Sequence, residues 1–413
     1  MRGITQVRGV TPREHGNQAP LAGVHPVMRI VMTTNPGAGH VGPLVPFARA
    51  FIRAGDEVIV AAAESAREAV ERAGVPFHPL ADPPREQLEA VWRSLPGLDH
   101  EVQGFRVMRE IFAGLRARAS LPGLLRLVTE RRPDVVLRET TEYAGLLAAE
   151  RLGVRHGRIG IMAAAMEAWG MPIVAPVLDG HRKRLGLRPD PGSHRIDSSP
   201  YFTVLPEAME DPGYRGPAHM VRFREPAAPV APLPDWWGGD DRPLVYVTYG
   251  SVTPTMPIFA PLFRATVDAL GALPVRALFT VGTEIEVESL GSAPANVRVE
   301  PWVDQAAAMP HAAAVVGHGG SGTTRMALAA GVPSVIVPGF ADQHRNARRV
   351  AEIGAGIALD DGIGGLPTAV HRLLEEPSYR EAARRVAAEV AALAPVDEAP
   401  DALRDWFVPA RAA

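Results

Sequence analysis

The chain has 413 residues, a formal net charge of −3 and 46% hydrophobic residues, which is enough for two domains with complete apolar cores. This charge balance gives no support for a nucleic-acid surface, and no apolar run is long enough to cross a membrane. The absence of cysteine excludes disulfides and thiolate metal sites and suits a reducing compartment, so we expect a cytoplasmic protein.

The first half alternates strand and helix patterns. Residues 1–27 lack apolar periodicity and a signal-peptide core, and we interpret them as a disordered leader. Short apolar strands are expected at 28–33, 55–61 and 75–80, each followed by a helical or irregular segment. Such alternation predicts an α/β domain with a parallel sheet covered on both faces.

Two segments interrupt this rhythm. Residues 82–112 carry Trp92, Phe105 and Phe112 among prolines and charges, and either form a binding surface or pack as helices on the domain edge. Residues 162–172 are rich in methionine, which adapts to irregular apolar ligands but also fills cores. Strands at 133–137, 155–161 and 201–205 complete this half.

A proline-rich stretch at 212–242 predicts a linker. The pattern then restarts, with a domain predicted at 243–390 and a helical tail at 391–413.

A glycine-rich turn in the second half predicts an anion site. The apolar run 312–316 indicates a buried strand, four glycines follow at 317–322, and an Ala/Leu-rich helix begins at Thr323. Unpaired N–H groups and the helix dipole favour a negative ligand there, and His318 can donate to a phosphate oxygen. By itself such a turn is also typical of an ordinary strand-to-helix connection.

The residues around this turn carry a family resemblance. The run Gly317-His318-Gly319-Gly320-Ser321-Gly322-Thr323, with Pro301 to Gln305 before it and Pro338 to Gln343 after it, resembles the nucleotide-sugar signature of GT-B glycosyltransferases, specifically the bacterial enzymes that glycosylate natural products. The resemblance extends from Met28 to the C-terminus. It implies two Rossmann-like domains that face a central cleft, an acceptor domain at 28–211, a donor domain at 243–390, and a C-terminal helix that crosses back to the first domain.

The resemblance also implies a set of donor-binding residues. Trp302 matches the aromatic residue that stacks on the nucleobase, with Val303 and Gln305 near the nucleoside. Asp304 stands where the family usually has proline. The positions that match the diphosphate and sugar contacts are Ser251, His318, Gly320, Ser321, Gly322, Thr323, Asp342 and Gln343. Asp342 is also a candidate N-cap of the helix that follows it.

Met326 bears on which nucleotide is bound. It occupies the position at which plant relatives keep a ribose-binding glutamate. Loss of that acceptor fits a deoxyribose, so the sequence favours a thymidine diphosphate sugar, with a uridine diphosphate sugar as the alternative donor.

His40 is the expected catalytic base, because it follows the first strand in a glycine turn and matches the family's catalytic position. The resemblance also implies an orienting carboxylate, usually an aspartate, soon after the fourth strand, where this sequence offers Glu139 as the first choice and Glu142 as the reserve. No Asp-X-Asp motif adjoins the phosphate site, and the other histidines show no metal-ligand spacing, so neither a metal nor a cofactor is expected.

The preferred function is therefore an inverting hexosyltransferase that moves a deoxysugar to a hydroxyl of an apolar natural product. A nucleotide-sugar 2-epimerase of the same fold is an alternative. It would need acid and base groups at the sugar rather than an acceptor pocket, and the apolar segments 92–112 and 162–171 favour the transferase. A non-catalytic partner of a glycosyltransferase is a second alternative, which the presence of both His40 and the pair Asp342-Gln343 disfavours. No nucleic-acid or membrane partner is expected, and a homodimer is left open.

Overall fold

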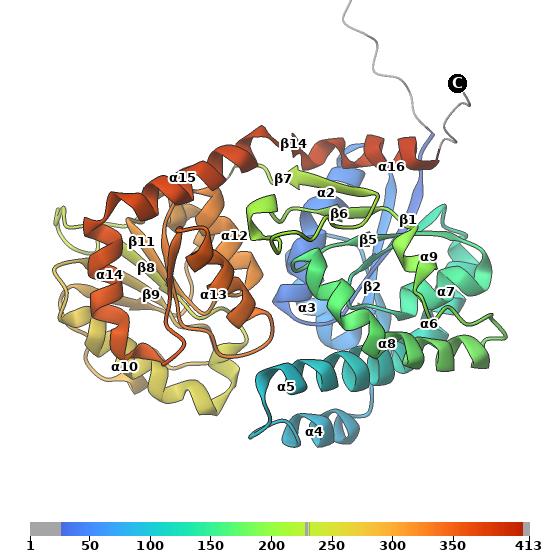
Figure 1. Ribbon diagram of the computed structural model, residues 1–413, viewed down its shortest axis with the longest axis horizontal. Coiled ribbons are helices and arrows are strands. Elements are labelled where there is room, and N and C mark those ends of the chain that lie inside the picture. Colours follow the sequence, from blue (N-terminus) through green and yellow to red (C-terminus); the bar gives the residue numbers. More distant parts are fainter. Residues whose placement is uncertain (1–25, 228–229, 231, 408–413) are drawn as a thin grey trace, which may run out of the picture.

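The computed structural model describes residues 26–227, 230 and 232–407, which form two α/β units side by side (Figure 1). Apart from its last two residues, the predicted leader at 1–27 lies outside the described part of the chain, and so does the end of the predicted tail, 408–413.

The first unit is built on an eight-stranded parallel sheet with the order β14-β7-β6-β5-β4-β1-β2-β3. Strands β1 and β4 are direct neighbours, with Ile30 opposite Val135. Their carboxyl ends therefore meet at one edge of the sheet, where ligands of open α/β folds bind. The strands are β1 Arg29–Thr34, β2 Glu57–Ala63, β3 Phe77–Leu80, β4 Val135–Glu139, β5 Arg155–Ile159, β6 Tyr201–Thr203, β7 Met220–Arg224 and β14 Ala394–Pro395.

Helices cover both faces of this sheet, as its apolar strands require. Along β1, Ile30 and Met32 belong to one buried cluster and Val31 to another, so successive side chains supply the two cores in turn. The helices of this unit are α1 Ala38–Val41, α2 Val45–Arg53, α3 Arg67–Arg72, α4 Arg85–Arg93, α5 His100–Arg106, α6 Ala117–Arg131, α7 Ala144–Leu152, α8 Ala164–Arg184 and α9 His194–Asp197.

The irregular segment predicted at 82–112 is largely helical. Helices α4 and α5 are followed by a ten-residue π-helix, η3 Val107–Arg116, which continues into α6. Runs of π-helix are rare and frequently occur at functional sites. Phe105 stacks on Trp169 of α8 with ring centroids 4.3 Å apart, so some of the aromatic residues pack internally, whereas Trp92 is exposed.

The second unit has a six-stranded parallel sheet in the order β10-β9-β8-β11-β12-β13. Its strands are β8 Leu244–Thr248, β9 Arg276–Thr280, β10 Val297–Glu300, β11 Ala314–Gly317, β12 Ser334–Ile336 and β13 Gly356–Ala358. The main helices are α10 Ala260–Gly271, α11 Gln305–Ala308, α12 Ser321–Ala329, α13 Gln343–Glu352, α14 Leu366–Glu375 and α15 Pro377–Ala392. The edge strand β13 is too short and glycine-rich to be visible in the sequence pattern.

The stretch 212–242, predicted as a linker, contains a strand of the first sheet. Strand β7 pairs with β6 and β14, and its Phe223 is buried in the core. The first unit thus continues beyond residue 211. The sequence conceals this strand because it is five residues long and alternates apolar residues with two arginines between proline-rich flanks.

The C-terminal segment crosses from the second unit to the first. After α15 the chain forms β14 and then α16, Ala399–Phe407, which lies over the first unit in Figure 1. Leu403 is buried in the core below α2, and Arg404 forms an ion pair with Asp56.

The two units also share a packed interface. Arg345 and Arg349 of α13 bind the Asp211 carboxylate and the Ala208 carbonyl of the first unit. These contacts hold the edge of the first sheet against the glycine turn region of the second.

Candidate active site

A histidine and a glutamate meet at the carboxyl ends of β1 and β4. The chain leaves β1 through Gly37, whose φ of +113° suits glycine, and turns into α1, which carries His40. His40 Nδ1 lies 3.1 Å from Oε1 of Glu139, the last residue of β4. The structure therefore brings together the two residues that the resemblance implies as a catalytic pair.

Glu139 is completely buried and well supplied with donors. Asn35 Nδ2 donates to Oε1 at 2.9 Å, the backbone N–H of Thr141 donates to Oε2 at 2.5 Å, and the Thr141 hydroxyl lies 2.8 Å from Oε1. Burial alone would raise the pKa of Glu139, but the interaction with His40 and the hydrogen bonds from Thr141 outweigh it and lower this pKa. The carboxylate is consequently ionised at neutral pH.

The ionised carboxylate determines the tautomer of His40. A carboxylate can only accept, so the proton of the neutral imidazole resides on Nδ1, and the lone pair is on Nε2. The ring of Phe112, from η3, packs edge-on against the imidazole with centroids 5.2 Å apart. This arrangement leaves Nε2 as the nitrogen that can accept a proton.

Glu142, the second candidate for the carboxylate that pairs with His40, makes different contacts. Its carboxylate accepts hydrogen bonds from the Thr33 hydroxyl and from the backbone N–H groups of Ala144 and Gly145, at 2.7 and 2.9 Å for the latter two. It therefore satisfies the first turn of α7. Burial raises the pKa of Glu142, against the effect of these donors.

Sequence reasoning missed the arginine that holds this loop. Arg138 is fully buried and donates to the carbonyl oxygens of Glu139 and Thr140 at 3.1 and 2.7 Å. Glu167 of α8 pairs with Arg138 and with Arg158, at 3.0 and 2.9 Å. The only sequence signal for this network was an arginine at the end of an apolar strand.

The glycine turn of the second unit forms a cradle around His318. Gly320 precedes α12, and the helix has no side-chain cap at its N-terminus, so its first N–H groups remain available. A Cβ on Gly320 would lie 2.4 Å from His318 Nε2, and one on Gly250 would lie 2.7 Å from the ring. Glycine at both positions is therefore required by the imidazole that lies between them.

Burial lowers the pKa of His318 to about 4. His318 is therefore neutral at neutral pH. Its Nε2 lies between Gly250 and Gly320, whereas Nδ1 is buried without a partner among the described residues, so the tautomer with its proton on Nε2 offers the cradle a neutral N–H donor rather than a cation.

The two residues predicted to bind the donor sugar differ in burial: Asp342 is partly exposed, whereas Gln343 is buried. Asp342 Oδ2 accepts from Ser321 and from Asn346, at 2.6 and 2.8 Å. Asp342 is the N-cap residue of α13, as the alternative interpretation expected, but its side chain makes no capping hydrogen bond to that helix. Gln343 is only 3% exposed, and its Oε1 accepts from the N–H groups of Gly339 and Phe340, which places this oxygen in the loop.

Asn346 links the glycine turn to Asp342. It donates to the carbonyl of Gly319 at 2.8 Å as well as to Asp342, and it is buried. Sequence reasoning did not single it out.

The predicted nucleoside contacts lie beside the cradle. Trp302 is 69% exposed, which is unusual for tryptophan and fits a face open to a stacked base. Gln305 Nε2 donates to the Thr323 hydroxyl at 3.0 Å, and Ser251 is exposed in the turn after β8. Met326 and Val303 pack on an apolar cluster that also receives Trp236 and Trp237 from the connecting segment.

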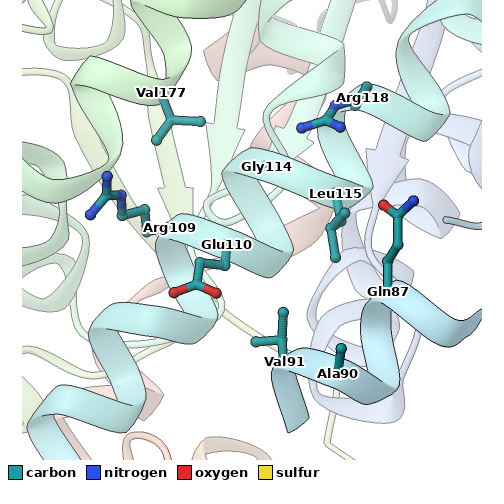
Figure 2. Close-up of a pocket in the computed structure, with 9 residues that line it drawn as sticks. All are labelled: Gln87, Ala90, Val91, Arg109, Glu110, Gly114, Leu115, Arg118 and Val177. Carbon is teal, nitrogen blue, oxygen red and sulfur yellow. The ribbon is translucent and has the colours of Figure 1, made fainter. Parts of the chain in front are cut away.

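A cavity of about 430 Å³ lies on a different face of η3 from Phe112. Figure 2 shows that side chains from α4, η3, α6 and α8 surround it. Its lining residues are Gln87, Ala90, Val91, Arg109, Glu110, Gly114, Leu115, Arg118 and Val177. It does not include His40 and is separate from the candidate active site.

Among residues 26–227, 230 and 232–407, no cluster of three or more His, Asp or Glu side chains is arranged to hold a metal ion. In the same residues no helix has the length and apolar composition needed to span a membrane.

The two Rossmann-like α/β units, each with a parallel sheet, have the fold of GT-B glycosyltransferases. Residues 264–403 match the family model described as "Erythromycin biosynthesis protein CIII-like, C-terminal domain". The chain is 33% identical over 378 residues to the L-demethylnoviosyl transferase of Streptomyces niveus, with 88% of this chain and 94% of the relative covered. It is also 33% identical to the elloramycin glycosyltransferase of Streptomyces olivaceus, over 90% of this chain and 96% of the relative.

Solved structures agree with this assignment. The glycosyltransferase from Streptomyces nogalater is 27% identical and superposes with a TM-score of 0.69 over 92% of this chain and 99% of its own. A Streptomyces glycosyltransferase complexed with thymidine diphosphate is 27% identical with a TM-score of 0.72, over the same shares of the two chains. The chain belongs to the family of antibiotic glycosyltransferases and is a glycosyltransferase of natural-product biosynthesis.

Proposed function

We propose that this enzyme transfers a deoxysugar from a thymidine diphosphate sugar to a hydroxyl of a largely apolar natural product, with inversion at the anomeric carbon and without a metal ion. The observation that carries this proposal is the 3.1 Å contact between His40 and the ionised, buried Glu139. Binding of thymidine diphosphate by a relative of 27% identity supports the choice of donor.

His40 Nε2 removes the proton of the acceptor hydroxyl, and Glu139 stabilises the imidazolium that results. The acceptor oxygen then bonds to the anomeric carbon from the face opposite the diphosphate, while the bond between that carbon and the phosphate oxygen breaks. The diphosphate leaves with the electron pair. Backbone N–H groups at the start of α12, the neutral N–H of His318 and the Ser251 hydroxyl receive its charge.

The decisive variant is His40→Ala. It should lower kcat for sugar transfer by about 10²–10⁴-fold, the range supplied by a general base, while the affinity for thymidine diphosphate in calorimetry stays within about twofold. His371→Ala, which removes an exposed histidine of α14, is the matched control and should keep both values. Undiminished kcat in His40→Ala would remove His40 as the base.

A further inference from the structure

One arginine beside the catalytic pair has no counter-ion. Arg116 ends η3, and its Nε and NH1 atoms are buried without a hydrogen-bond partner among the described residues. Four other described arginines also have a buried Nε without a partner, but each forms an ion pair: Arg138, Arg158, Arg222 and Arg404. Arg116 makes no such pair within the residues that the structure describes.

The place of Arg116 in the helix directs it toward the catalytic pair. Phe112, four residues earlier on the same helical face, packs against His40. The carboxylates whose charge acts on Arg116 are those of Asp82 and Glu139, at the carboxyl ends of β3 and β4. The guanidinium therefore lies at the edge of the sheet where the acceptor has to meet His40.

Neither carboxylate forms a direct ion pair with Arg116 in the described structure. Asp82 accepts from the backbone N–H and the hydroxyl of Ser65, at 3.0 and 2.6 Å. Glu139 is engaged by His40, Asn35 and Thr141. The charge of Arg116 thus lacks the direct partner that buried arginines normally have.

An arginine cannot relieve this situation by losing its proton, and burial of an unpaired guanidinium is costly. Burial indeed lowers the pKa of Arg116 despite the two nearby carboxylates. The third nitrogen, NH2, is not among these buried unpartnered atoms, so it is the end of the guanidinium that a ligand can reach. A carboxylate at NH2 would supply the missing counter-charge.

We propose that Arg116 binds a carboxylate of the acceptor, so that the enzyme selects acceptors that join an apolar body to an acidic group. This inference rests on the proposed function, because it assumes that the acceptor lies beside His40. It narrows the acceptor class from apolar natural products to acidic ones.

The test measures equilibrium binding and needs no turnover. 7-Hydroxycoumarin-3-carboxylic acid and its ethyl ester share a ring system and a phenol, and differ in one negative charge. Their fluorescence is titrated with the full chain saturated with thymidine diphosphate. The wild type should bind the acid about tenfold or more tightly than the ester, Arg116→Gln should abolish the difference, and Arg116→Lys should keep part of it.

Arg118→Gln is the matched control, since it removes the same charge from an exposed arginine two residues away that lines the separate cavity. It should keep the preference for the acid. Equal binding of the two probes by the wild type, absence of binding of both, or an equal loss for both in Arg116→Gln each overturns the proposal. The last result would mean that Arg116 acts through Glu139 or the fold.

A second measurement uses the unliganded protein. Arg116→Met replaces an unpaired guanidinium by an apolar side chain of similar length, so Tm should stay the same or rise. A Tm that falls by several degrees in both the Met and Gln variants overturns the proposal, because it reveals a structural partner. His40→Ala should keep the preference for the acid, and a failure of His40 as the base therefore leaves the result for Arg116 readable.

Discussion

The two halves of the cleft handle charge in opposite ways. In the first unit, charged side chains are buried and paired: Glu139 with His40, and Glu167 with two arginines. In the second unit, the cradle consists of glycines, the open N-terminus of α12 and an imidazole that burial keeps neutral. In the proposed function, fixed charge is thus placed where a proton has to move, and neutral dipoles are placed where an anion has to enter and leave.

This difference has a functional consequence. In the proposed function, the neutral cradle binds the diphosphate through oriented N–H groups, whose attraction is strong for the anion but weaker than that of a buried cation. The product nucleotide can therefore dissociate. The dyad, in contrast, does not bind a charged ligand and must keep one tautomer, which a buried carboxylate ensures.

The largest effect that tests this comparison is expected for Glu139→Gln. The amide keeps the shape of the carboxylate but can donate to Nδ1, which places the imidazole proton on Nε2 and removes the base. We expect kcat to fall by about 10³–10⁴-fold, with an unchanged dissociation constant for thymidine diphosphate, measured by steady-state kinetics and calorimetry.

Glu142→Gln is the matched control, because this carboxylate is also buried but satisfies α7 and does not contact His40. Glu142→Gln should lower Tm and should leave kcat largely unchanged. Similar losses of kcat in the two variants would contradict the assignment of Glu139 as the orienting carboxylate.

A smaller effect is expected in the pH dependence of stability. The pKa of His318 is about 4 in the folded protein and about 6.5 when the chain is unfolded, so the unfolded state binds the proton first as the pH falls. Stability should decrease between pH 6.5 and pH 4, by up to about 3 kcal/mol from this residue. Urea denaturation of the wild type and of His318→Asn at several pH values measures it.

The difference in the free energy of unfolding between the wild type and His318→Asn should become smaller as the pH falls from 6.5 to 4. The exposed His371→Asn is the control and should follow the wild type. A constant difference from pH 7 to pH 4 would show that folding does not lower the pKa of His318.

The two halves also differ in how far sequence predicts them. The cradle is local: strand, glycines, His318 and helix are contiguous, and the pattern predicted their arrangement closely. The dyad joins residues 99 positions apart, so only the family resemblance pointed to Glu139. Nothing in the local sequence distinguishes Glu139 from Glu142, and the structure separates their contacts.

Some features depend on packing alone and left no signal in the sequence. Arg138 and Asn346 act through contacts with loop carbonyls, which no spacing rule reveals. The π-helix η3 places Phe112 on His40, although the sequence there shows only mixed charges and apolar residues. Strand β7 was hidden within the predicted linker because tertiary pairing, rather than propensity, forms it.

The smallest expected effect concerns the choice of nucleotide. Met326 lies in the second turn of α12 and packs on an apolar cluster together with Val303 and the tryptophans Trp236 and Trp237. A thioether among such neighbours offers no strong acceptor to a ribose 2′-hydroxyl. Burial of that hydroxyl without a partner costs roughly 1–3 kcal/mol, so thymidine diphosphate should bind about tenfold or more tightly than uridine diphosphate.

Calorimetric titrations of the two nucleotides measure this ratio. Met326→Glu should narrow or reverse it by supplying an acceptor, whereas Met326→Leu, which keeps the apolar contact, should preserve it. Since Met326 is only partly buried, the glutamate can reach toward the ligand and keep the fold. A water molecule that pairs with the 2′-hydroxyl would reduce the ratio. Equal affinities in the wild type that Met326→Glu leaves equal would contradict the deoxyribose argument, because they would show that the residue at position 326 does not distinguish the two nucleotides.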